Sequence, residues 1–410
     1  MASNGILAGL DLGSTRTAAV IAAPNDDGLL EIQGLGMSPT RGIKKGVVIN
    51  LERTIDSIEA AMEIAETQAG TSVESVTVGI AGDHIKSINS RGVIAVRNPD
   101  NEISRGDVER VIEAARAIAL PGDREIIHVM PQEFTVDDQG GIHDPVGMTG
   151  VRLETEVHII TGASTPIQNL LKCVRRAGLE VERVVLGSVA ASTAVLTQDE
   201  MELGAVLVDI GGGTTDVAVF ADGGLKHTAV VGVGGTNVTN DIAIGLRTPL
   251  AAADEIKRAH ATLRPEEGLE EEITVPGVNG RPERTVSRSI LNQIVQPRME
   301  EILALSYREV KKTDYWDLLA AGLVLTGGGS QLSGTLEMAE RMFNLPAKQG
   351  APFGLAEYPE GVDSPDLATA VGLVRYAHRE DDEQGRPSFG GGKALGRLAG
   401  QMKRWVEDFF

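Results

Sequence analysis

The chain has 410 residues, of which 42% are hydrophobic and only 3% aromatic, and it contains 49 glycines. Because a single core rarely grows beyond roughly 250–300 residues, we expect two α/β lobes with cores of Val, Ile, Leu and Ala. A formal net charge of −20 repels phosphate backbones, so no nucleic-acid partner is expected. The single cysteine, Cys173, excludes an internal disulfide. With neither a signal-like N-terminus nor a run of about 18 apolar residues, the sequence predicts a protein that is neither secreted nor membrane-spanning.

The N-terminal part of the chain begins with three apolar runs joined by turns that carry Gly and Asp. These runs predict an antiparallel meander of strands at Ile6–Leu10, Ala18–Ala23 and Leu30–Leu35. Apolar residues then recur at helical spacing over 51–69, and Val76–Ile80 has the composition of a strand. A helix between two strands indicates a crossover connection.

Residues 84–161 have a different pattern of predicted strands and helix, which predicts a small inserted subdomain. We expect a helix over Ser104–Ala119, which opens with Ser104 before Asp107, and strands at Gly92–Val96, Ile126–Val129 and Val157–Ile160. Two further helices are predicted after it, over Pro166–Ala177 and Ser188–Leu196.

The pattern of three strands predicted at the N-terminus repeats after Gly204. A second meander is predicted at Ala205–Asp209, Thr215–Phe220 and Thr228–Val233, and its first strand ends in an aspartate, as the first strand of the chain does. This repetition predicts two similar domains. Residues 242–310 look mostly helical, with the acidic run Glu266–Glu272 as a solvated loop. Residues 321–378 should contain a buried strand, Gly322–Thr326, a glycine corner and two helices.

Three glycine corners follow predicted strands, and each can present backbone N–H groups to a phosphate. The first contains Asp11, Gly13, Ser14, Thr15 and Arg16. The second contains Asp209, Gly211, Gly212, Gly213, Thr214, Thr215 and Asp216, and its consecutive glycines indicate a close backbone approach. The third contains Gly327, Gly328, Gly329 and Ser330, and the pair Gly234 and Gly235 ends the second meander, where it can approach a terminal phosphate. No corner matches G-x-x-x-x-G-K-[ST] or a Rossmann G-x-G-x-x-G, so we expect one nucleotide site of another kind.

The C-terminal part of the chain predicts a tether and an amphipathic helix. Residues 379–394 are charged and glycine-rich, which is typical of a flexible linker. In 395–410 the apolar side chains fall within an arc of roughly 140° at about 100° per residue. Such a helix can dock on the protein's own core or lie in a bilayer interface. The linker and the local excess of positive charge favour an anionic membrane, contacted by Leu395, Leu398, Met402, Lys403, Arg404, Trp405, Val406, Phe409 and Phe410.

The stretches DLGSTRT, DIGGGTTD and LTGGGS resemble the two phosphate loops and the adenosine loop of the actin, Hsp70 and sugar-kinase superfamily. Within it, HVMPQEF (128–134), DPVGMTGVRLETEVHIIT (144–161) and VQPRMEEI (295–302) resemble the bacterial cell-division family FtsA, over about 5–378 and again in the tail. The resemblance implies two RNase H-like, actin-like domains around a nucleotide cleft. Its expected parts are domain 1 (5–83 and 163–203), an inserted subdomain (84–162), domain 2 (204–241 and 311–378), a helical subdomain (242–310), the linker (379–394) and the membrane helix (395–410).

The resemblance also implies roles for individual residues. Asp11 and Asp209 would hold Mg²⁺ through water and orient the attacking water, and Gly211 to Thr215 would wrap the phosphates of ATP. Lys257 would reach the adenosine, with Asn237 and Asp254 in the same nucleotide set. Where the family carries a glutamate, this chain has Asp254 beside Glu255, so which acid meets the ribose stays open. The 187–196 helix offers no water-positioning glutamine, so we expect slow ATP turnover at most.

The partners implied by the resemblance belong to bacterial cell division. They are a second copy of the chain in actin-like filaments, the C-terminal peptide of FtsZ near 242–310 with Arg298 as a contact, and further division proteins on 84–162. The implied location is the inner face of the cytoplasmic membrane at the division site. A sugar or acid kinase and an Hsp70-like chaperone are the alternatives; no peptide-binding β-domain follows residue 378.

Overall fold

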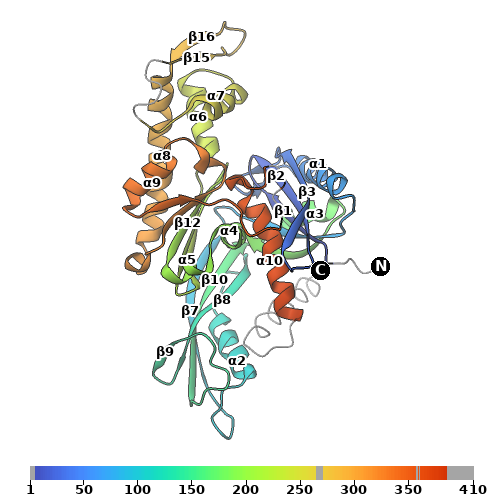
Figure 1. Ribbon diagram of the computed structural model, residues 1–410, viewed down its shortest axis with the longest axis vertical. Helices are drawn as coiled ribbons and strands as arrows, with labels where there is room; N and C mark the ends of the chain where they lie inside the picture. Colours follow the sequence, from blue (N-terminus) through green and yellow to red (C-terminus); the bar gives the residue numbers. More distant parts are fainter. Residues whose placement is uncertain (1–4, 265–270, 357–358, 360, 386–410) are drawn as a thin grey trace.

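The computed structural model describes residues 5–264, 271–356, 359 and 361–385 and contains two five-stranded sheets of the same topology (Figure 1). In each sheet, an antiparallel meander is extended by two parallel strands, which confirms the predicted repetition. The first sheet has the order β11 (Glu180–Leu186), β6 (Ser75–Ile80), β1 (Leu7–Leu12), β2 (Arg16–Pro24), β3 (Leu30–Pro39). The second has the order β14 (Gly224–Val231), β13 (Thr215–Ala221), β12 (Ala205–Ile210), β17 (Gly322–Thr326), β18 (Ala347–Gln349).

Helix α1 (Leu51–Ala69) covers the meander of the first sheet and confirms the helix predicted over 51–69. The Asn50 side chain accepts a hydrogen bond from the Arg53 N–H at its start, and Gly70 ends it in a left-handed conformation. Helix α3 (Ser164–Arg176) packs beside it. A short hairpin, β4 (Ile43–Lys44) and β5 (Val47–Val48), lies between β3 and α1 and was not predicted.

Helices α4 (Gly187–Val195) and α10 (Ala368–Gly385) pack against each other at the junction of the two domains. Helix α4 is almost entirely buried and contacts both sheets, which explains why it carries small or apolar side chains and no charged one. Helix α10 packs on β1, β2 and β6 of the first sheet (Figure 1). The remaining short elements of this region are α5 (Gln198–Leu203), η1 (Trp316–Leu318), η2 (Gly328–Gln331) and η3 (Pro365–Leu367).

The position of α10 corrects two expected domain boundaries. Domain 2 was expected to include 311–378, but Val371, Leu373 and Val374 belong to the first hydrophobic core. The chain returns to domain 1 because this apolar face of α10 is buried against β1 and α4. The linker was expected over 379–394, but α10 continues to Gly385, and Asp381 on it forms an ion pair with Arg183 of β11.

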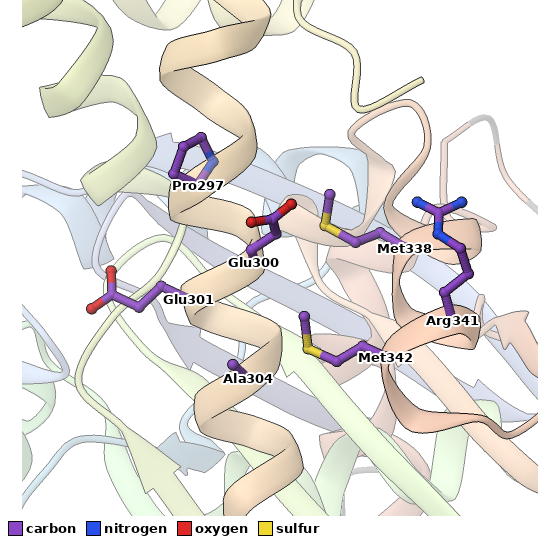
Figure 2. Close-up of a pocket in the computed structure, with 7 residues that line it drawn as sticks. All are labelled: Pro297, Glu300, Glu301, Ala304, Met338, Arg341 and Met342. Atoms are coloured by element: carbon purple, nitrogen blue, oxygen red, sulfur yellow. The ribbon is translucent and has the colours of Figure 1, made fainter. Parts of the chain in front are cut away.

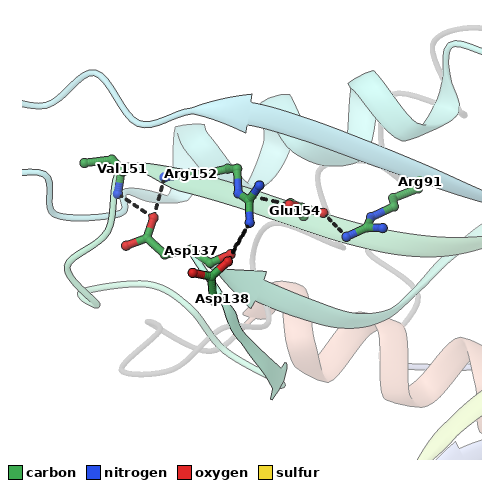
Figure 3. Close-up of polar contacts among 6 residues, drawn as sticks. All are labelled: Arg91, Asp137, Asp138, Val151, Arg152 and Glu154. Carbon is green, nitrogen blue, oxygen red and sulfur yellow. Dashed lines mark hydrogen bonds and ion pairs between the residues drawn. The ribbon is translucent and has the colours of Figure 1, made fainter.

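The inserted subdomain is a four-stranded sheet with one helix packed against it. The sheet has the order β7 (Lys86–Ala95), β10 (Arg152–Ala163), β8 (Arg124–Val136), β9 (Gln139–Ile142), and the helix is α2 (Arg105–Arg116). Ser104 and Asp107 form a reciprocal cap at the start of α2, as the sequence indicates. At the outer end, Asp137 accepts hydrogen bonds from the N–H groups of Val151 and Arg152, and Glu154 lies between Arg91 and Arg152 (Figure 3). These contacts fix the β8–β9 turn onto β10.

The inserted subdomain also contacts the second domain through the edge strand β14. The His158 ring is hydrogen-bonded to the Asn89 side chain through Nδ1 at 2.6 Å and to Thr228 Oγ1 of β14 through Nε2 at 3.0 Å. Ser87 Oγ donates to the carbonyl oxygen of Thr228 at 2.8 Å. A buried polar junction thus joins the insertion to the second domain.

The region 242–310 is mostly helical, as predicted. Its helices are α6 (Gly235–Gly245), α7 (Leu250–His260) and α8 (Arg288–Lys311), and α9 (Thr335–Phe343) packs on α8. An unpredicted hairpin, β15 (Glu272–Val275) and β16 (Arg284–Ser287), lies at this end of the molecule (Figure 1). Most of the acidic run 266–272 lies outside the described residues.

Candidate nucleotide site

The first two glycine corners touch each other across the domain junction. A Cβ placed on Gly212 would lie 2.5 Å from Thr15 Cγ2, and one placed on Gly213 would lie 2.4 Å from Ser14 Oγ. Only glycine permits such an approach, because any side chain would collide with the opposite corner. The structure therefore brings together the two corners that the sequence places almost 200 residues apart.

The pair Gly234 and Gly235 packs against the second corner. The N–H of Gly235 donates to the Gly211 carbonyl at 2.9 Å, and the N–H of Thr236 donates to the Gly212 carbonyl at 2.8 Å. Asn237 Oδ1 accepts from the Gly234 N–H at 3.1 Å, so its side chain holds this turn at the start of α6.

The third corner, which leads from β17 into η2, lies against Asp209. Gly327 has a φ of 80°, and a Cβ on it would lie 2.1 Å from Asp209 Oδ1. Thr369 in the first turn of α10 donates to Asp209 Oδ2 at 3.1 Å. Because β12 pairs in parallel with β17, with Asp209 opposite Thr326, the second and third corners meet at one sheet edge.

Arg16 and Asp366 form an ion pair between the first corner and η3, and Arg16 also donates to the Asp366 carbonyl. Asp366 precedes α10, whose first turn reaches Asp209. Arg16 therefore lies in the predicted site, but it is paired with a carboxylate that the sequence analysis missed.

Three carboxylates gather at this junction: Asp11, Asp209 and Asp216, which ends the second corner and for which no role was predicted. Burial raises the pKa of Asp11 to about 7; Arg16 lowers it, and Asp209 and Asp366 add to the rise. Burial raises the pKa of Asp209 to about 6, against the lowering effects of its Thr369 hydrogen bond and of Arg16. For Asp216, burial and then the charge of Asp209 raise the pKa to about 8.

These carboxylates fit a magnesium-bound nucleotide. Asp216 Oδ1 is buried and has no hydrogen-bond partner in the described structure, and a hydrated cation would supply one. Mg²⁺ keeps several of its waters and takes carboxylates as partners, which suits contacts through water. Within 5–264, 271–356 and 361–385, no group of three His, Cys, Asp or Glu side chains is arranged as a metal cluster. In the proposed site, Asp11 and Asp209 would hold the ion, whose charge would favour their ionised forms.

The predicted adenosine contacts lie on α7 beside Gly235. Lys257 Nζ donates to the Gly235 carbonyl at 3.3 Å, to Thr239 Oγ1 at 2.7 Å and to Asp254 Oδ1 at 2.7 Å. Burial pushes the pKa of Asp254 upward, but hydrogen bonds and charge from Lys257 and Arg258 bring it down to about 2. Glu255 is exposed, so Asp254 is the acid that lies beside Lys257.

Several predicted hydroxyl groups are already engaged within the corners. Thr215 Oγ1 donates to the Val233 carbonyl, Ser330 Oγ donates to the Gly327 carbonyl, and Thr214 Oγ1 donates to Asp216. Contacts from these residues to phosphate would therefore come from the backbone, as the glycines beside them permit.

The predicted partner residue Arg298 lies on α8, where Asp241 and Glu301 pair with it. Beside it, Pro297, Glu300, Glu301, Ala304, Met338, Arg341 and Met342 line an open groove of about 580 Å³ between α8 and α9 (Figure 2). The predicted membrane residues, 395–410, lie outside the described residues. Among the helices of the described residues, none offers an apolar stretch of the length that a bilayer requires.

A family model described as cell division protein FtsA matches residues 206–372, and one described as SHS2 domain inserted in FTSA matches 82–161. The chain is 43% identical over 414 residues to cell division protein FtsA of Pseudomonas aeruginosa, covering 100% of this chain and 99% of that protein. It is 37% identical over 379 residues to the Escherichia coli FtsA protein, covering 90% of each.

Solved structures with the same fold include the PilM-PilN type IV pilus biogenesis complex. Its TM-score is 0.65 at 17% identity, over 91% of this chain and 98% of that one. Spiroplasma citri MreB5 bound to ADP has a TM-score of 0.56 at 14% identity, over 93% and 99% of the two chains. These likenesses confirm the actin-like fold class. The relatives and the family models show that the chain belongs to the cell division protein FtsA family.

Proposed function

We propose that this chain binds Mg²⁺ and ATP between its two domains, polymerises, and tethers the FtsZ ring to the inner face of the cytoplasmic membrane at the division site. The observation that supports the proposal is that the first two glycine corners meet beside Asp11 and Asp209. Residues from both domains would contact one ligand, so binding would change how the domains sit against each other. Such a change is what a nucleotide-controlled filament requires.

ATP would act mainly as the ligand that sets the filament state. Asp11 and Asp209 would hold the hydrated ion, and the backbone from Gly211 to Thr215 would hold the phosphates. Magnesium supplies charge neutralisation for the triphosphate when it is bound. Asp254 and Lys257 lie beside Gly235, where they would contact the ribose and adenine. We expect ATP turnover to be slow, because α4 carries no glutamine that could position the attacking water.

The membrane role rests on the sequence of 395–410, whose apolar side chains align on one face. Seven half-buried side chains would gain roughly 5–10 kcal/mol, less the cost of folding the helix, so one subunit would bind marginally. A filament would present many tails at once and bind firmly. Self-association and membrane attachment therefore belong to one proposal.

Sedimentation with liposomes of anionic lipid tests this proposal. The full chain should pellet with liposomes, and more of it should pellet with ATP than without. Replacing Trp405 and Phe409 with glutamate should leave nucleotide binding intact and abolish pelleting, whereas Glu407→Gln should pellet normally. Unchanged pelleting of the Trp405 and Phe409 variant would reject the membrane role. Sugar-stimulated release of ADP would favour a kinase instead.

The FtsZ contact is proposed for the α8 surface around Arg298. Arg298 is partly exposed, and the acids that pair with it, Asp241 and Glu301, can be exchanged for acids of a peptide. The adjoining groove contributes methionine side chains, which adapt to different apolar partners (Figure 2). Further division proteins are proposed to bind the inserted subdomain.

Titration of a fluorescent FtsZ C-terminal peptide tests the α8 surface. Arg298→Glu should weaken binding about tenfold or more, because it reverses a charge that a carboxylate would contact. Arg308→Glu, at an exposed position on the same helix, is the matched control and should bind as the unmodified chain does. Equal affinity for both variants would place the peptide elsewhere.

A further inference from the structure

The tip of the β4–β5 hairpin carries a lysine in a strained conformation. Lys45 and Gly46 form the two-residue turn of this hairpin, and both have positive φ, 52° for Lys45 and 76° for Gly46. Glycine adopts such a conformation freely, and asparagine adopts it more readily than lysine does. The fold nevertheless holds a long cationic side chain at this position.

The hairpin tip lies where the first two glycine corners meet. The N–H of Gly46 donates to Ser14 Oγ at 3.1 Å. A Cβ placed on Gly213 would lie 3.0 Å from the Lys45 backbone nitrogen, and one placed on Gly46 would lie 2.2 Å from the Ala81 carbonyl oxygen. The tip is therefore held between the first two glycine corners and the end of β6, so the backbone of Lys45 has little conformational freedom.

The ammonium group of Lys45 lies near Gly232, which follows β14 and precedes Gly234 by two residues. A Cβ placed on Gly232 would lie 3.8 Å from Lys45 Nζ and 3.9 Å from Asp83 Oδ2. In the described part of the chain, no carboxylate lies within ion-pair distance of this half-buried ammonium group. Three residues after Gly232, a Cβ on Gly235 would lie 3.9 Å from Lys257 Nζ. Two lysines thus lie along the segment 232–235, one from each domain.

We propose that Lys45 binds the terminal phosphate of ATP and makes the site prefer ATP over ADP. This inference rests on the proposed nucleotide function and adds a residue to it. The Lys45 ammonium group has no ion-pair partner in the described structure, and the backbone of Lys45 lies against the first two glycine corners, so this residue is matched to an oxyanion. Lys257 Nζ is already paired with Asp254, which leaves Lys45 as the lysine of this segment that can pair with the terminal phosphate. Because Lys45 comes from domain 1 and touches Gly213 of domain 2, its contact with the phosphate would close the two domains together.

Competition binding of ATP and ADP to the full chain with Mg²⁺ tests the proposal. Lys45→Asn removes the ammonium group and suits the left-handed turn, so it should not disturb the hairpin. It should weaken ATP binding about tenfold or more and ADP binding less than about threefold. Lys45→Arg should recover most of the preference for ATP. Lys44→Gln, at the exposed neighbouring position, should behave as the unmodified chain.

Three outcomes of this experiment overturn the inference. If Lys45→Asn bound ATP with unchanged affinity, Lys45 would not contact the phosphate. If it lost affinity for ATP and ADP equally, Lys45 would only stabilise the hairpin turn. Failure of Lys45→Arg to restore the preference excludes a role for the charge. If the unmodified chain bound neither ATP nor ADP, the proposed function itself would be overturned. That result is distinct from the three above, because it is seen without any Lys45 variant.

Discussion

Asp216 lies directly opposite Asp209 in the antiparallel pairing of β12 with β13. Residues opposite each other in such a pair place their side chains on the same face of the sheet. Both carboxylates are therefore withdrawn from water together, and a proton or a cation must offset their charge. In the first domain Ala18 is opposite Asp11, so the two corners differ in this respect.

Asp216→Asn should change how stability depends on pH in metal-free protein. The folded pKa of Asp216 is raised to about 8 from an ordinary 3.8, so its favourable contribution is full below about 4 and is lost as pH rises to about 8. In EDTA, the variant should therefore lose less thermal stability than the unmodified chain between pH 5 and pH 8. Asp26→Asn, at an exposed position, should not alter the slope. Parallel curves for Asp216→Asn would contradict the assigned burial.

Replacing both Asp11 and Asp209 with asparagine should abolish nucleotide binding. The loss should be at least about a hundredfold, because two charged contacts to the hydrated ion disappear while the fold keeps its shape. Titration with a fluorescent ATP analogue measures it, and adding EDTA to the unmodified chain should have the same effect. The exposed Asp56→Asn is the matched control. Retained affinity in the double variant would show that the nucleotide binds elsewhere.

Gly327→Ala should be far more harmful than Gly328→Ala. At Gly327 the φ is 80° and a Cβ would lie 2.1 Å from Asp209 Oδ1, whereas a Cβ on Gly328 would lie 3.5 Å from Asp366 Cβ, an ordinary van der Waals contact. We expect Gly327→Ala to cost roughly 2–3 kcal/mol and Gly328→Ala less than about 0.5 kcal/mol. Thermal unfolding of the two variants side by side checks this. Similar midpoints would mean that the third corner is not packed against Asp209.

The buried His158 predicts a loss of stability in acid. Burial, and then the neighbouring His227 and His128, lower its pKa to about 3 from 6.5. Its contribution is therefore full above about pH 6.5 and is lost as pH falls, by about 2 kcal/mol at pH 5. His158→Gln should lose less stability between pH 7 and pH 5 than the unmodified chain. The exposed His143→Gln should match the unmodified chain over this range.

Much of the fold could be predicted from periodicity alone. Both meanders and α1 follow from short apolar runs and helical spacing, and Ser104 with Asp107 marks the start of α2. Strand β11 was missed because Glu180, Glu182 and Arg183 interrupt its apolar pattern at the edge of the sheet. The position of α10 on domain 1 could not be inferred, because it depends on the fit of its apolar face to β1 and α4.

The candidate site was predicted where consecutive glycines indicate close backbone approach. Asp216 belongs to the second corner, but its pairing with Asp209 was not predicted, although counting outward from the hairpin turn places the two residues opposite each other. Lys45 and Asp366 gave no such clue, because they reach the site from a hairpin and a loop that are distant in the sequence. Spatial convergence of this kind becomes visible only in three dimensions.

Helix α10 connects the candidate nucleotide site with the segment that leads to the proposed membrane anchor. Its first turn holds Asp209 through Thr369, and its 18 residues form a stiff rod about 27 Å long. In the sequence, the segment that leads to the proposed membrane anchor follows Gly385 directly. A load on the anchor would therefore be transmitted along this rod to a carboxylate beside the phosphates. Tension at the membrane and occupancy of the nucleotide site would then act on the same residue.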